Sequence, residues 1–156
     1  MSSVMEKYCN GVYKFIEQSV FCMIIEKSVG AIVVNPAGLY LLLNRADKNG
    51  DLWEFPKGHQ LEYENDIETL RRELKEETGI EKFELIENFV GKNEYVSSST
   101  GNTRIILLYL IKVPNYKVII SKEHKDHIWA TFDDALTKLN HDTWRKILTS
   151  AKKRLD

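Results

Sequence analysis

The stretch Gly58–Ile80, "GHQLEYENDIETLRRELKEETGI", decides the fold of this sequence. Asn65 followed three positions later by Glu68 has the spacing of a capping box, in which each side chain satisfies a free backbone amide at the start of a helix. Gly79 stands where helices commonly end on a left-handed residue. These signals predict a helix over Asp66–Thr78. Its core-facing residues follow the i, i+3, i+7, i+11 spacing of an amphipathic helix and are Ile67, Leu70, Leu74 and Thr78.

Three acids crowd together beside this apolar stripe. Glu73, Glu76 and Glu77 lie at i, i+3 and i+4, within about a third of the helix circumference. A like-charged i, i+4 pair costs about 0.2 to 0.5 kcal/mol, and acids in the last turn also face the negative end of the helix dipole. An ordinary solvated face accounts for part of the charge pattern but not for this cluster. A divalent cation would remove the conflict, because hard cations such as magnesium bind carboxylate oxygens together with substrate phosphates.

The composition is typical of one soluble globular domain. The chain has 156 residues, of which 43% are hydrophobic, and a net charge of −1, so it is long enough to bury a core. We therefore expect a single domain over residues 1–156, in which residues 1–27 form an N-terminal extension to which the sequence assigns no role. The near-neutral charge excludes bulk binding to nucleic acid or to a membrane surface, since both need a strongly basic surface.

The cysteines and the apolar segments indicate the compartment. Cys9 and Cys22 have no metal-ligand spacing and form no disulfide framework, as is typical of a reducing cytoplasm. The apolar run "VFCMII", residues 20–25, is too short to span a membrane or to form a signal peptide. The sequence predicts a cytoplasmic protein, a monomer or a homodimer, with no membrane partner.

Strand patterns flank the acidic helix on both sides. Apolar, β-branched runs predict the strands, and Thr131 has the place of an N-cap before the first of two closing helices. Residues 13–25 suit either a strand or a short helix. Strands on both sides of a helix, with helices at the end, indicate an α/β layered domain. The expected strands are 27–34, 39–45, 83–91 and 103–113, the expected loops are 46–59 and 92–102, and the expected closing helices are 131–140 and 143–155.

The spacing within Gly58–Ile80 resembles a known family signature. Gly58, five residues, Glu64, seven residues and then "RELKEETGI" from Arg72 match every fixed position of the Nudix box. By this resemblance the chain is expected to fold as the Nudix-type α/β/α sandwich with a mixed central sheet. Members of the family hydrolyse a nucleoside diphosphate linked to another moiety, using magnesium or manganese ions.

The resemblance also implies roles for residues of the motif. The metal ligands would be Glu73, Glu76, Glu77 and the backbone carbonyl of Gly58. Arg72 would hold the glutamates in place, and Glu64 would bond within the unit of loop and helix. Simple salt bridging is an equal alternative for Arg72 and Glu64, because both interpretations use the same contacts.

The flanking motif "WEFPKGH", residues 53–59, resembles that of the asymmetrical diadenosine tetraphosphate hydrolases. Lys57 is then a phosphate contact, because an ammonium group offsets charge on a polyphosphate, with a solvated loop lysine as the alternative. His59 is a further substrate-binding candidate whose alternative is a hydrogen-bonded surface histidine. Trp53 is expected to pack at the mouth of the site.

A second motif, "SKEHKDHIW" at residues 121–129, resembles a segment of the same subfamily. Glu123 would supply a further carboxylate, as metal ligand or as the base that accepts the proton of the attacking water. The sequence does not decide between Glu123 and a helix glutamate as the base, and a polar loop residue is the alternative for Glu123. His124 and His127 are expected to be loop groups.

Two tyrosines are candidates for contact with a base. Tyr95 and Tyr109 each offer a ring on which adenine can stack, at about 1 to 3 kcal/mol per base, although Tyr109 also suits the core or the sheet surface.

These expectations together predict a magnesium-dependent Nudix pyrophosphohydrolase that cleaves diadenosine tetraphosphate to ATP and AMP. Nucleoside triphosphates, nucleotide sugars and capped RNA ends are alternative substrates. A catalytically silent nucleotide sensor is the alternative from another class, and the full set of glutamates counts against it. The predicted catalytic residues are Arg72, Glu73, Glu76 and Glu123.

Overall fold

The structure, a computed structural model, describes residues 12–16, 22–45, 50–115 and 117–156. The helices of this part are α1 (Asp66–Thr78), α2 (Phe132–Lys138) and α3 (Asp142–Leu155). The strands are β1 (Val12–Ile16), β2 (Cys22–Val34), β3 (Tyr40–Arg45), β4 (Trp53–Glu54), β5 (Lys57–His59), β6 (Glu84–Val96), β7 (Thr103–Lys112) and β8 (His124–Ala130).

The strands form one mixed sheet. The main order is β4-β3-β2-β7-β6, while β1 and β5 also pair with β2, and β8 pairs with β3. β2 and β7 run parallel, and the other pairs are antiparallel. Successive residues of β2 point to opposite faces of this sheet. In the second half of β2, residues 29–34 are buried on both faces of the sheet.

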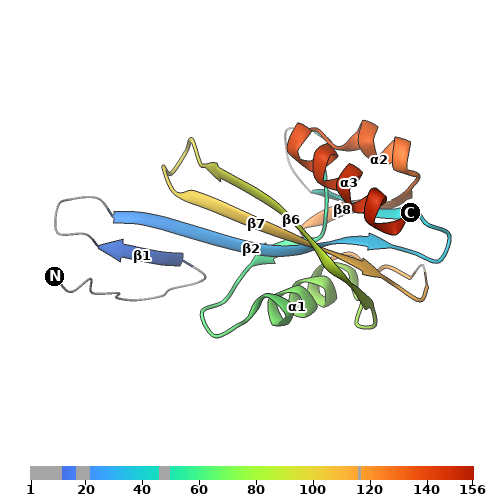
Figure 1. Cartoon of the computed structure of the whole chain (residues 1–156), viewed down its shortest axis with the longest axis horizontal. Helices are drawn as coiled ribbons and strands as arrows, with labels where there is room; N and C mark the ends of the chain where they lie inside the picture. The colour runs from blue at the N-terminus through green and yellow to red at the C-terminus, as the bar shows by residue number, and fades with distance from the viewer. Residues whose placement is uncertain (1–11, 17–21, 46–49, 116) are drawn as a thin grey trace.

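Helices cover both faces of the sheet (Figure 1). Ala31 and Val33 of β2 belong to a core that includes Leu74 of α1. Ile32 and Val34 belong to a second core, on the opposite face, to which α2 and α3 contribute. The predicted α/β/α sandwich with a mixed sheet is therefore confirmed.

The central strands β2 and β3 separate soon after their hairpin turn. Their register holds a single pair, Val34 with Tyr40. Farther along β2, β5 pairs with it instead, so that Gly30 faces Lys57. A Cβ atom at Gly30 would lie 2.3 Å from the carbonyl oxygen of Pro56, so the absent side chain is what lets β5 approach. This separation brings the "PKGH" segment to the centre of the sheet.

The acidic helix has the predicted bounds. α1 spans Asp66–Thr78, and the Asn65 and Glu68 side chains each accept a hydrogen bond from the other residue's backbone amide. Gly79 ends the helix in the left-handed region with φ 71°. The capping signals in the sequence therefore define this helix locally. Thr131 likewise caps α2, as expected.

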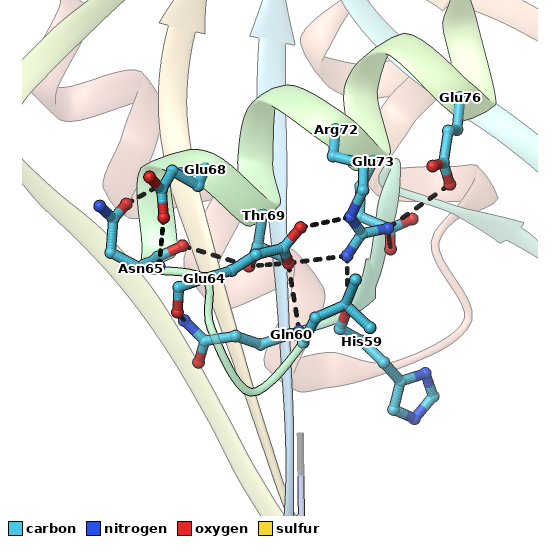
Figure 2. A network of polar contacts seen from close by, with 10 residues as sticks. His59, Gln60, Glu64, Asn65, Glu68, Thr69, Arg72, Glu73 and Glu76 are labelled. Carbon is cyan, nitrogen blue, oxygen red and sulfur yellow. Dashed lines mark hydrogen bonds and ion pairs between the residues drawn. The ribbon is translucent and has the colours of Figure 1, made fainter. Parts of the chain in front are cut away.

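An ion pair joins α1 to the loop that precedes it (Figure 2). Arg72 donates through Nε to Glu64 Oε1 at 2.5 Å and through a terminal nitrogen to Glu64 Oε2 at 2.9 Å. Glu64 also accepts hydrogen bonds from the Leu61 amide and the Thr69 hydroxyl. The Arg72 contact lowers the pKa of Glu64 to about 2.

Three expected loops are wrong in part. β6 continues to Val96, so Tyr95 lies on a strand and not in a loop. The segment 46–59 contains the short strands β4 and β5. His124 and His127, expected as loop groups, lie on β8. In each case strand pairing with a neighbour overrides a polar local sequence.

The N-terminal segment is described in part. Val12–Ile16 forms β1, which pairs with β2, while residues 1–11 and 17–21, including Cys9, lie outside the described residues. Within the described ranges, no helix is long and apolar enough to cross a membrane. The single domain over residues 1–156 stays a prediction.

Substitution of Gly30 by alanine is predicted to lower the free energy of unfolding by about 1 to 3 kcal/mol. The added methyl group would meet Pro56 and Lys57 at distances that require β5 to move. Urea denaturation followed by circular dichroism measures the change. An unchanged midpoint would contradict this tight contact between β2 and β5.

Substitution of Glu64 by glutamine is predicted to cost about 2 to 3 kcal/mol at pH 7, because it leaves the Arg72 guanidinium without its main partner. The folded-state pKa of Glu64, about 2, lies below the ordinary value of 4.5. The stability that Glu64 contributes is therefore fully present above pH 4.5 and is lost as the pH falls toward 2. Denaturation at pH 7 and at pH 3 should give a smaller difference between wild type and variant at pH 3. A difference independent of pH would refute this assignment.

Candidate active site

An acidic cavity lies between α1, β5 and the segment before β8. Its volume is about 650 Å³. The C-terminal half of α1 provides three glutamates, and the turn before β8 provides a fourth. The carboxylates on its wall are Glu54, Glu73, Glu76, Glu77 and Glu123, and the cationic or imidazole groups are Arg45, Lys57, His59, Arg72, Lys122 and His124. All residues predicted as metal ligands therefore line one cavity.

The helix glutamates differ in their exposure to solvent. Glu77 is 7% exposed, and burial raises its pKa to about 7. Burial also raises the pKa of Glu73, although the neighbouring Arg72 opposes the shift. Glu76 is open to solvent, with 59% of its side chain exposed. Two of the three helix carboxylates are thus held in surroundings that disfavour their charge.

Gly58 lies directly against Glu73. A Cβ atom built on Gly58 would come within 2.0 Å of the Glu73 carboxylate, so any larger residue would push this side chain out of place. On the same strand, the Lys57 amide donates to Glu77 Oε2 at 2.9 Å. β5 therefore sets the positions of Glu73 and Glu77.

The carboxylates do not form a closed ligand set. Among the described residues, no group of three or more His, Cys, Asp or Glu side chains is arranged to hold a metal ion. Arg72 explains part of this, because its guanidinium donates to Glu73 at 2.5 Å and to Glu76 at 3.5 Å (Figure 2). The donor set itself fits a hard divalent cation, since it offers carboxylate oxygens around one open cavity. Such a cation would compensate the negative charge of the buried Glu77 carboxylate.

A second cavity of about 550 Å³ adjoins the acidic one. Trp53 and Tyr95 lie on its wall, and 41% of Tyr95 is exposed. The residues that line both cavities are Ser28, Arg45, Glu54, Lys57 and His59. The two cavities therefore share a wall that carries positive charge.

Lys57 and His59, both predicted to bind substrate, lie on this shared wall. The Lys57 ammonium group donates to Glu54 Oε2 at 2.8 Å, and 17% of its side chain is exposed. The structure thus brings Lys57, His59 and Tyr95 to the cavities, as it does the acidic residues.

Tyr109 is not brought to either cavity. Its hydroxyl donates to Asp66 Oδ2 at 3.0 Å at the start of α1, and its ring packs against the core on that face of the sheet. This position agrees with the alternative that Tyr109 belongs to the core or the sheet surface, and it does not bring Tyr109 together with the other predicted site residues. Strand residues alternate between faces, and the sequence does not say which face adjoins the cavity.

Several residues that line these cavities were given no role from the sequence, among them Glu54, Arg45 and His124. Glu54 stood inside the "WEFPKGH" motif but was given no role, and Arg45 ends β3 without a motif of its own. His124 was expected to be a loop group, yet its side chain is 2% exposed and its Nε2 lies 3.8 Å from Glu54 Oε1. Contacts with His124 and Lys57 outweigh the effect of burial and lower the pKa of Glu54 to about 2.

Two known proteins are similar to this chain in sequence. The mouse asymmetrical bis(5'-nucleosyl)-tetraphosphatase is 39% identical over 98 residues, which make up 62% of this chain and 66% of that protein. The rat protein of the same name is 36% identical over 104 residues, which are 65% of this chain and 71% of that protein. The matched stretch thus spans about two thirds of the mouse protein's length.

A solved structure shows the same fold. The C. elegans Ap4A hydrolase in a binary complex has a TM-score of 0.76 with this chain, at 26% identity, and covers 83% of this chain and 97% of its own. The sequence pattern of the NUDIX domain matches residues 25–151, which include the helix glutamates, β5 and the Glu123 turn. The chain therefore belongs to the Nudix hydrolase family.

Proposed function

We propose that this Nudix protein hydrolyses a phosphoanhydride bond in diadenosine tetraphosphate, giving ATP and AMP. The observation that carries the proposal is the pair of adjoining cavities, one lined by four acidic groups of the Nudix box and the Glu123 turn, the other by Tyr95 and Trp53. Lys57 on the shared wall would lie beside a polyphosphate that passes from one cavity to the other. The names of the mouse and rat relatives support the same substrate class.

A divalent cation, magnesium or manganese, is part of the proposal. Glu73, Glu76 and Glu77 would hold it, with Glu123 and the Gly58 carbonyl as further oxygen donors. When bound, such an ion neutralises charge on phosphate oxygens and lowers the pKa of a coordinated water.

The protein's own groups would orient the substrate and handle the proton. Glu123 or a helix glutamate would accept the proton of the attacking water. Lys57 would offset the negative charge that develops on the phosphate oxygens. Arg72 would keep Glu73 in the cavity through their ion pair.

The setting of the reaction is also proposed. The near-neutral charge and the cysteine content favour a cytoplasmic monomer or homodimer with a small nucleotide substrate.

Glu76→Gln is predicted to lower kcat for diadenosine tetraphosphate on the order of 100-fold, because it removes one anionic oxygen donor from the cavity. Glu76 is largely exposed, so the variant should stay folded. The reaction is run with magnesium in oxygen-18 water, and mass spectrometry should find the label in the AMP phosphate.

Glu81→Gln is the matched control. Glu81 is an exposed acid just beyond α1 that pairs with Lys75 and does not line the acidic cavity. It should keep the rate of the wild type. Absence of turnover by the wild type would refute the substrate, and binding of a non-hydrolysable analogue without turnover would favour the nucleotide sensor.

Tyr95→Leu is predicted to raise KM about 5- to 150-fold with little change in kcat, since stacking on a base contributes about 1 to 3 kcal/mol to binding. Tyr109→Phe is the comparison variant, because Tyr109 contacts Asp66 away from the cavities. It should lose about 0.5 to 1.5 kcal/mol of stability and leave KM unchanged. Steady-state kinetics and thermal denaturation test both statements, and an equal KM effect of the two variants would contradict the placement of the base.

A further inference from the structure

A closed ring of contacts joins α1 to the turn before β8. The Ser121 amide donates to the Glu77 carbonyl at 3.2 Å, and the Ser121 hydroxyl lies 3.3 Å from His124 Nδ1. His124 Nε2 is 3.8 Å from Glu54 Oε1, and Glu54 Oε2 accepts from the Lys57 ammonium at 2.8 Å. The Lys57 amide donates to Glu77 Oε2 at 2.9 Å, which closes the ring.

The ring lies largely out of solvent. The side chains of Glu54 and His124 are 13% and 2% exposed, and Glu77 is 7% exposed. A carboxylate on a wall that is to receive phosphates would repel them, so Glu54 is poorly suited to contact the substrate. Its two oxygens instead face Lys57 and His124. This arrangement suits a residue that positions others.

Glu123 lies between two members of this ring. The His124 amide donates back to the Ser121 carbonyl at 3.2 Å, which forms the turn that carries Glu123. At one end of the turn the Ser121 amide is hydrogen-bonded to the Glu77 carbonyl of α1, and at the other end the His124 ring lies 3.8 Å from Glu54. Glu123 and the helix glutamates line the same cavity.

We propose that His124 and Glu54 are positioning residues that hold the Ser121–His124 turn against α1, so that Glu123 faces the helix glutamates. The inference rests on the proposed function for its catalytic consequence, but the structural link is independent of the substrate. It assigns a role to the buried His124 and the partly buried Glu54, which lie outside the Nudix box.

A double-mutant cycle separates positioning from general stability. His124→Leu removes both imidazole contacts and should lower kcat about 10- to 100-fold with KM within about threefold of wild type. In a Glu123→Gln background the same substitution should cost no more than about twofold, because the residue that it positions is already inactive. His124→Gln, which keeps a polar side chain toward Glu54, should recover part of kcat. Equal losses in the two backgrounds would overturn the proposal.

Hydrogen exchange provides a readout that needs no turnover. Exchange of the backbone amides at positions 121 and 124 should speed up in His124→Leu and in Glu54→Gln at a pH where both variants remain folded. Asp51→Asn is the control, because it removes an exposed ion pair with Lys125 on β8 and leaves the ring intact.

The kinetic cycle and the amide exchange together distinguish a failure of the proposed substrate from a failure of the positioning role. If the wild type does not cleave diadenosine tetraphosphate, the proposed substrate is wrong, and amide exchange alone decides the positioning role. Unchanged exchange in both ring variants would overturn that role, even if the wild type is active.

Discussion

The positions of the loop before α1, of α1 itself and of the acidic side chains in the cavity all depend on the ion pairs of the Arg72 guanidinium group. It pairs with Glu64 in the preceding loop, with Glu73 and Glu76 on α1, and donates to the His59 carbonyl at the end of β5. One cation thus offsets part of the repulsion between crowded carboxylates and at the same time ties β5 to the helix. Pairing of this kind among partly buried groups contributes more than an exposed surface salt bridge, because solvent screens it less.

The position of β5 provides the other half of the site. β2 and β3 separate after one register pair, and β5 occupies the place beside β2 that β3 leaves. Gly30 permits this approach, and Gly58 on β5 permits Glu73 to lie across it. Two glycines in two strands therefore set the distance between the sheet and the glutamates of α1. The backbone, and not a flexible loop, holds the acidic side chains in place.

Local signals predicted α1 and its acids, whereas contacts distant in the chain could not be predicted. Asn65, Glu68 and Gly79 act within a few residues of their own positions, so the helix bounds followed from the sequence. The link from His124 to Glu54 depends on β8 and β4 both pairing with β3, and no spacing in the sequence encodes that.

The errors have the same origin. β6 lies at the edge of the sheet, where a strand can carry polar residues on both faces, so its polar end was mistaken for a loop. For Tyr109 the sequence left two positions open, because alternation along a strand defines two faces without indicating which of them adjoins a cavity. The pairing partners of β6 and β7 must be known before the end of β6 or the face on which Tyr109 lies can be predicted.

Glu54 and Glu77 are two carboxylates with little exposure to solvent, and the fold gives them different surroundings. Burial disfavours the charge of both, yet the pKa of Glu54 is about 2 and that of Glu77 is about 7. Glu54 has His124 and the Lys57 ammonium beside it, whereas Glu77 accepts a hydrogen bond from the Lys57 backbone amide. The protein already compensates the charge of Glu54, which suits a fixed structural member. Burial still outweighs the nearby positive groups at Glu77, and a divalent cation bound beside it would compensate its charge. Lys57 of β5 thus pairs its ammonium group with Glu54, while the carboxylate of Glu77 contacts the Lys57 backbone amide and could also bind a cation.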